Sequence, residues 1–176
     1  PGLISLFDEL GVERSTSEMS FSVQSPQTQG QAAIEWSGHS LNTVFAQRRN
    51  LLRPRFWSML SDILRFNKLS TQLAQSGAEA ALAQPIGEFL DAHRFSTAFR
   101  EDYFLPMVAC IWSCPTQQML RFPMATMIRF CHNHGLLQVT NRPQWYTVTG
   151  GSRQYVSKVV SHLQDVRLNT PVKAVT

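Results

Sequence analysis

One stretch near the carboxyl end of the chain has residue types that suit ligand binding. Residues 145–149 are aromatic or β-branched, which predicts a short strand. Gly150 and Gly151 follow, and glycines can adopt a positive φ and allow a ligand to approach the backbone closely. Ser152 is then a predicted N-cap for a helix whose free N–H groups favour an anionic or polarised group. An ordinary tight strand-to-helix connection would give the same pattern, so the stretch alone does not establish a site.

A second candidate is the basic segment 46–55. Its arginines are Arg48, Arg49, Arg53 and Arg55. From Ala46 to Lys68 the only acid in the sequence is Asp62. One interpretation is a solvated face beside a core helix; the other is a surface for phosphate, carboxylate or anionic lipid, with Trp57 as an interfacial anchor. We do not expect nucleic acid as a partner, because no readout motif accompanies the basic run.

Cysteines and histidines suggest a metal site only weakly. The group is Cys110, Cys114, Cys131, His132 and His134. This spacing matches no common zinc pattern, so we expect buried, inert thiols and no metal. The sequence also lacks a Walker loop, a Gly-x-Gly-x-x-Gly turn, a Gly-x-Ser-x-Gly elbow and a His-Glu-x-x-His helix. No residue is therefore assigned a catalytic role.

Composition indicates a folded protein with more apolar surface than its own core would bury. Hydrophobic residues make up 43% of the chain and charged residues 16%, below the usual quarter. Low charge of this kind suggests that a ligand or another domain covers some apolar surface. The net charge of +4 permits anionic partners. With no secretory segment and no run long enough to span a bilayer, we expect a cytoplasmic protein, at the membrane periphery if the basic segment binds lipid.

Periodicity and turn residues predict an α+β fold. Strands are expected at 19–23, 33–36, 41–45, 136–139, 145–149 and 166–175, and helices at 3–10, 54–75, 86–94, 96–112, from Pro115, at 124–134 and from Ser152 to about 162. Because runs of helix and strand are segregated, we expect one small antiparallel sheet with a cluster of helices from 54 to 134 packed against it. Pro106 should kink the 96–112 helix or mark a boundary within it.

Several motifs together resemble a known family. They are 6–12 (LFDELGV), 19–23 (MSFSV), 45–57 (FAQRRNLLRPRFW), 111–115 (IWSCP), 130–137, 142–145 (RPQW) and 148–156 (VTGGSRQYV). In combination they resemble a bacterial group of FAD-dependent oxidoreductases of the flavin-containing amine oxidase type, relatives of protoporphyrinogen oxidase and the carotenoid desaturases. The likeness covers nearly the whole chain.

The resemblance implies a two-domain flavoprotein of which this chain is an internal piece. Residues 1–164 would be the substrate-binding domain, and 165–176 a strand returning to the FAD-binding domain. Trp145, Gly150 and Gly151 would lie near the flavin, and Val172 would meet the adenine end of FAD through its backbone. The dinucleotide fingerprint and the carboxy-terminal flavin segment of the family are missing, so the full-length protein would hold FAD and the chain alone would be inactive.

Two functions remain open from the sequence. The first is the substrate-binding part of a flavin oxidoreductase, in which flavin removes hydride from a small, hydrophobic molecule at an amine or a C–C or C–N bond. Its partners would be that substrate and the missing FAD-binding segments of the same protein. The second is a non-enzymatic module that binds an anionic lipid or a partner protein through Arg48, Arg49, Arg53 and Arg55.

Overall fold

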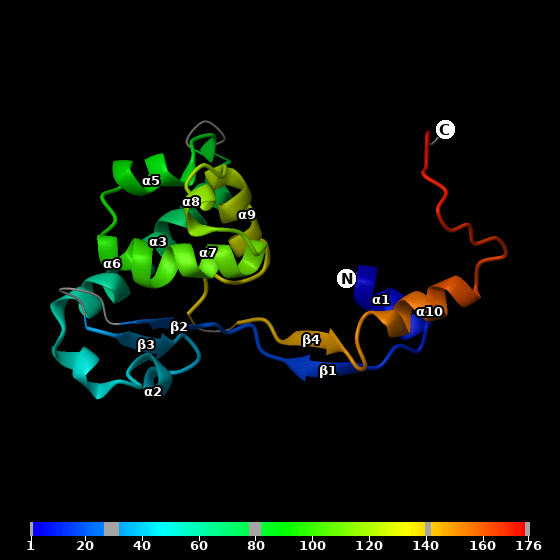
Figure 1. Cartoon of the computed structure of the whole chain (residues 1–176), viewed down its shortest axis with the longest axis horizontal. Helices are drawn as coiled ribbons and strands as arrows, with labels where there is room; N and C mark the ends of the chain where they lie inside the picture. Colours follow the sequence, from blue (N-terminus) through cyan, green and yellow to red (C-terminus); the bar gives the residue numbers. More distant parts are fainter. Residues whose placement is uncertain (1, 27–31, 78–81, 140–141, 175–176) are drawn as a thin grey trace. The chain divides into compact units, whose positions relative to one another are not determined.

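The computed structural model describes residues 2–26, 32–77, 82–139 and 142–174 (Figure 1). The chain divides into two compact units, one formed by Pro1–Met19 with Gln144–Thr176 and the other by Ser20–Pro143. Both contain helices and a two-stranded antiparallel sheet, so the predicted α+β class is confirmed. The units separate at 19/20 and 143/144, whereas the resemblance placed a domain boundary at 164/165.

The smaller unit, called the ribbon unit here, joins the two ends of the sequence. Its elements are α1 (Gly2–Glu9), β1 (Arg14–Ser17), β4 (Trp145–Val148) and α10 (Arg153–Ser161). Strand β1 pairs antiparallel with β4, with Arg14 opposite Val148 and Ser17 opposite Trp145. The rings of Phe7 on α1 and Tyr155 on α10 lie 5.3 Å apart, so the two helices pack on each other.

The larger unit, called the helical unit here, begins with a hairpin. Strand β2 (Ser22–Ser25) pairs antiparallel with β3 (Ile34–Ser37). Val23, Ile34 and Trp36 are buried, which is the alternation expected of a sheet with one face on a core.

Helical elements of very different lengths follow the hairpin. They are α2 (Leu41–Val44), the 3₁₀-helix η1 (Arg48–Leu52), α3 (Pro54–Ser76), α5 (Ile86–Ala92), α6 (Thr97–Phe99), the π-helix η2 (Arg100–Phe104), α7 (Leu105–Trp112), α8 (Thr116–Met119) and α9 (Met124–Asn133). Pro54 lies in the first turn of α3, and α8 and α9 directly follow Pro115 and Pro123. Proline is tolerated at the start of a helix because the N–H that it lacks would have no partner within the helix. Pro106 lies in the first turn of α7, where the π-helical turn η2 ends, so the expected interruption is present.

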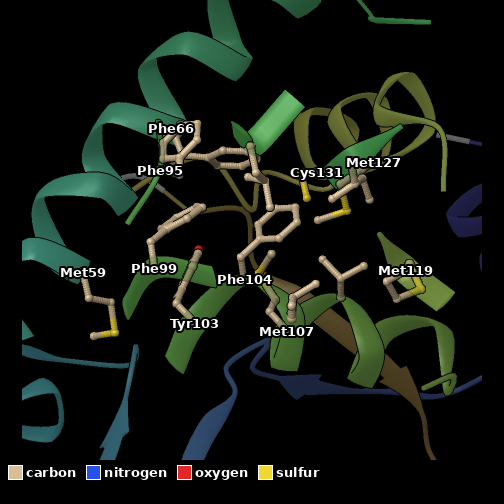
Figure 2. Packing of buried hydrophobic residues seen from close by; sticks show 14 of the residues in the cluster. Met59, Phe66, Phe95, Phe99, Tyr103, Phe104, Met107, Met119, Met127 and Cys131 are labelled. Atoms are coloured by element: carbon tan, nitrogen blue, oxygen red, sulfur yellow. The ribbon is translucent and has the colours of Figure 1, made fainter. Parts of the chain in front are cut away.

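Aromatic and methionine side chains fill the core of the helical unit (Figure 2). The ring of Phe104 lies 5.1 Å from that of Phe66 and 5.6 Å from that of Phe99. Met107, Met127 and other flexible thioethers occupy the space around these rings, as methionine commonly does in irregular cores. The wealth of aromatic residues and methionine between 107 and 130 therefore largely serves packing.

Four predictions about strands need correction. The strands form two separate sheets instead of one. Residues 41–45 contain helix α2, and 136–139 form turns. Residues 163–174 contain no strand, whereas a strand was expected over 166–175. Strand β1 was not predicted at all, because every side chain from Arg14 to Ser17 is polar.

In the part of the chain that the structure describes, no helix has both the length and the apolar character needed to cross a bilayer.

Candidate functional site

The Gly150–Gly151 turn follows β4 at one end of the β1–β4 ribbon and leads into α10. Thr149 N–H donates to the Glu13 carbonyl at 3.0 Å, and Gly151 N–H donates to the Val148 carbonyl at 2.9 Å. Gly150 has φ +75° and Gly151 has φ +84°. Both values lie in the region that favours glycine, so these two residues do adopt the positive φ that glycine permits.

The two glycines differ in how open their surroundings are. A Cβ on Gly150 would lie 3.1 Å from Gln154 Nε2, so the Gln154 side chain covers this residue. A Cβ on Gly151 would meet no atom within 4 Å. A ligand or another polypeptide segment can therefore reach the backbone of Gly151 without moving a side chain.

Ser152 does not act as the predicted N-cap. Its backbone is helical, with φ −58° and ψ −26°, and its side chain makes no capping hydrogen bond. An N-cap side chain reaches the first-turn N–H groups from an extended backbone, which Ser152 lacks. Instead, Gln154 N–H donates to the Gly151 carbonyl at 3.1 Å, so the turn backbone begins α10.

The residues assigned to FAD by resemblance are only partly brought together. Gly150 and Gly151 lie just beyond one end of β4, while half-buried Trp145 begins the strand, about 10 Å from Val148 at the usual rise per residue. Val172 is 81% exposed and lies outside any helix or strand. These residues fit FAD only as one edge of a site, through the open backbone at Gly151, and other polypeptide would have to bind the rest of the cofactor.

Arginines of the basic segment have different surroundings. Arg48 and Arg49 are exposed, whereas Arg53 and Arg55 are half-buried. Arg49 Nη2 and Arg53 Nη1 both donate to the Ala33 carbonyl, at 2.9 and 3.2 Å. These two side chains therefore anchor the start of β3 to η1 and to the residue that follows it.

Arg55 forms ion pairs that the sequence did not indicate. Its Nη2 lies 2.9 Å from Asp102 Oδ2 and 3.2 Å from Glu101 Oε2. Burial raises the pKa of Asp102, while the Arg55 guanidinium opposes that shift. The prediction of four exposed arginines without nearby acids is therefore wrong for Arg55, because acids 46 and 47 residues away in sequence lie beside it.

Thiols show a mixture of environments. Cys131 is buried, and burial raises the pKa of its thiol to about 12, which makes it the inert thiol that was predicted. Cys114 is half-buried and Cys110 is exposed, so burial was the wrong prediction for Cys110. Among the described residues, no group of three or more His, Cys, Asp or Glu side chains could hold a metal ion.

Sequence reasoning missed two buried carboxylates. Asp62 accepts hydrogen bonds from Ser96 N–H at 2.8 Å and from the Arg65 guanidinium at 2.8 and 3.1 Å. Asp102 belongs to η2 and pairs with Arg55. Arg65 lies three residues after Asp62 on α3, but Ser96 and, for Asp102, Arg55 come from distant parts of the sequence, so nothing local shows that either acid is buried.

In comparisons with known proteins, no family model matches the chain and no curated protein matches it.

Proposed function

We propose that the chain is the substrate-binding part of an FAD-dependent oxidoreductase, whose flavin is bound mainly by further segments of the same protein. The observation that carries the proposal is the open backbone of Gly151 at positive φ. A cofactor that approaches a backbone closely needs such a position, since any side chain there would project toward it. The resemblance of residues 148–156 to the flavin-adjacent motif of this family supports the same assignment.

The apolar surface of the ribbon unit also supports the proposal. Phe7 and Val12 are its buried residues among those the structure describes. Its exposed aliphatic side chains on α1, on α10 and just after α10 are Leu3, Ile4, Leu6, Val156, Val160 and Leu163. So much exposed aliphatic surface beside so small a core favours packing against further polypeptide, which the FAD-binding segments would supply.

The test is the visible absorption spectrum of the full-length protein and of its Gly151→Val variant. We expect the parent to carry flavin and the variant to lose the flavin band, because a branched side chain at φ +84° is strained and projects into the proposed approach path. Helix content by circular dichroism should stay near that of the parent.

Gly77→Val is the matched control. Gly77 has φ +64°, and a Cβ there would also meet no atom within 4 Å, so the backbone strain is comparable. This residue ends α3 in the helical unit, and its variant should keep stoichiometric flavin. A colourless parent protein, or equal flavin retention in both variants, would contradict the proposal.

A further inference from the structure

Large apolar side chains are exposed around η1 in the helical unit. Leu52 is 87% exposed, Leu41 79%, Trp57 49% and Leu51 44%. They come from α2, from the end of η1 and from the first turn of α3. Single exposed apolar residues are ordinary, but four within 17 positions of sequence require a reason.

Contacts connect the segments that carry these residues. Trp57 Nε1–H donates to the Leu51 carbonyl at 2.9 Å, and the Trp57 and Phe45 rings lie 5.5 Å apart. Arg48 Nη2 donates to Asn42 Oδ1, which ties η1 to α2 beside Leu41. The two short segments lie together at the edge of the helical unit, next to β3 (Figure 1).

Charge at this corner is positive. Arg48 and Arg49 are exposed, and residues 36–61 contain no Asp or Glu. Arg55 does not contribute in the same way, because Glu101 and Asp102 neutralise it. Arg53 is half-buried against Asn50 and Ala33.

We propose that this corner, the η1 corner, binds an anionic lipid surface. Leu52, Leu41 and Leu51 enter the apolar boundary of the membrane, and Arg48 and Arg49 contact lipid phosphate and carboxylate groups. Trp57 lies at the headgroup level, where tryptophan rings are enriched, with its N–H bonded to the Leu51 carbonyl. The η1 corner thus acts as a peripheral membrane anchor, an inference that does not depend on whether the protein binds flavin.

A lipid surface fits these residues better than a protein partner does. Arginines beside exposed leucine side chains match a membrane, whose surface is anionic and whose interior just beneath the headgroups is apolar. The last acid before the η1 corner in sequence is Glu35 on β3, and the two exposed arginines outweigh its charge.

Flotation of the whole chain with vesicles tests the proposal. We expect binding to phosphatidylcholine vesicles that contain phosphatidylserine, with affinity falling as salt rises. Arg48→Glu with Arg49→Glu should weaken binding by about tenfold or more, since each basic residue near such a surface contributes about fivefold. Leu52→Ser should weaken it by about tenfold, because the leucine side chain would no longer enter the apolar layer.

Matched variants distinguish binding through the η1 corner from general attraction of vesicles by the positive net charge of the chain. Arg121→Glu with Arg153→Glu changes net charge equally at exposed arginines elsewhere, and Val139→Ser removes an exposed aliphatic residue elsewhere. Both should bind nearly as the parent does. Equal weakening by the two double reversals would overturn the proposal, because net charge alone would then explain the binding.

Trp57 reports insertion directly. Brominated lipid should quench tryptophan emission in the parent, and the quenching should disappear in Trp57→Phe. Full competition by inorganic phosphate, without quenching, would show an anion site and contradict lipid insertion. Absence of vesicle binding would contradict it as well.

Discussion

Asp62 shows how one buried carboxylate can fix several segments of the helical unit. Its Oδ2 accepts the N–H of Ser96, and its Oδ1 accepts two hydrogen bonds from Arg65. Arg65 in turn donates to the His93 and Arg94 carbonyls at 2.8 and 3.2 Å. The carboxylate therefore connects α3 to the turn between α5 and α6.

The pKa of Asp62 leads to a pH-dependent prediction. Burial alone would raise this pKa, but hydrogen bonds from Ser96 and the Arg65 guanidinium lower it below its ordinary 3.8. A carboxyl whose pKa is lower in the folded state stabilises the fold above the unfolded pKa, and this contribution is lost as pH falls through the folded pKa. We expect Asp62→Asn to reduce the free energy of unfolding by about 1–3 kcal/mol at neutral pH.

Urea unfolding over a pH series measures this effect. The difference between parent and Asp62→Asn should shrink as pH falls below about 4, since the parent then loses the same charge. Asp8→Asn is the control, because the Asp8 side chain is exposed and its ion pair with Arg14 lies at the surface. A difference that stays constant down to strongly acidic pH would contradict the assignment.

Asp102 behaves in the opposite sense, and the contrast shows what sequence can indicate about single residues. Burial raises the pKa of Asp102, with Arg55 opposing, so its contribution is largest at low pH and declines as pH rises through the raised pKa. Both acids look alike in sequence. Apart from Arg65, three residues from Asp62, their partners Ser96 and Arg55 lie 34 and 47 residues away, and only the tertiary fold brings these near.

Helical elements followed sequence signals closely because those signals are local. Proline in or just before the first turn and glycine at the end mark α3, where Pro54 begins the helix and Gly77 has φ +64°. The short α2 was mistaken for a strand, since Leu41, Val44 and Phe45 suit either state. The side chains of Ser40 and Thr43 form a reciprocal capping box, and these hydrogen bonds stabilise the helical conformation of the segment.

Strands were less predictable, since their partners are distant. β1 is polar throughout, and its pairing with β4 joins residues more than 120 positions apart. Leu136 and Leu137 suggested a strand, but their side chains pack on the core from a turn: Leu136 N–H donates to the Cys131 carbonyl at 2.9 Å after Gly135 ends α9. Apolar residues just after a helix end can therefore pack against the core as part of the helix cap and need not form a strand.

Gly135 gives a prediction at the level of this helix end. It has φ +66°, and a Cβ there would lie 2.6 Å from Pro143 Cδ and 2.8 Å from Pro143 Cγ. Gly135→Ala therefore combines backbone strain with a steric clash against a rigid ring. We expect it to reduce the free energy of unfolding by about 2–4 kcal/mol, measured by urea denaturation.

Gly77→Ala isolates the strain component. Its φ is similar and its surroundings are open, so this variant should cost only about 1 kcal/mol. Equal costs at the two positions would show that Pro143 yields freely and that its contact does not fix the end of α9.

At the scale of the whole molecule, the two units have very different cores. All residues of the large buried cluster belong to the helical unit. The ribbon unit buries Phe7 and Val12 among its described residues and holds its helices partly by polar contacts, such as Lys158 Nζ with the Gly11 carbonyl. Composition had indicated spare apolar surface, but only the fold shows that it gathers on the ribbon unit and at the η1 corner.

At the candidate site, too, local features were predictable from sequence and long-range contacts were not. The sequence located the Gly150–Gly151 turn and the exposed pair Arg48 and Arg49, because glycine and arginine patterns are local. It did not reveal the neutralisation of Arg55, since that depends on acids 46 and 47 residues away in sequence.

The helical unit should fold without the ribbon unit, and this is the prediction that belongs to the whole chain. Residues 20–143 contain the entire buried cluster, including the fully buried Phe66, Phe99 and Phe104, and about 120 residues can form an independent core. We expect this fragment to unfold cooperatively in urea and to keep the near-ultraviolet circular dichroism of packed aromatic rings. Phe104→Ala in the fragment should remove about 3–5 kcal/mol, because the ring contacts Phe66 and Phe99 at the centre of the cluster. A fragment that keeps helix content but binds hydrophobic dye and melts without cooperativity would show that the core depends on residues outside 20–143.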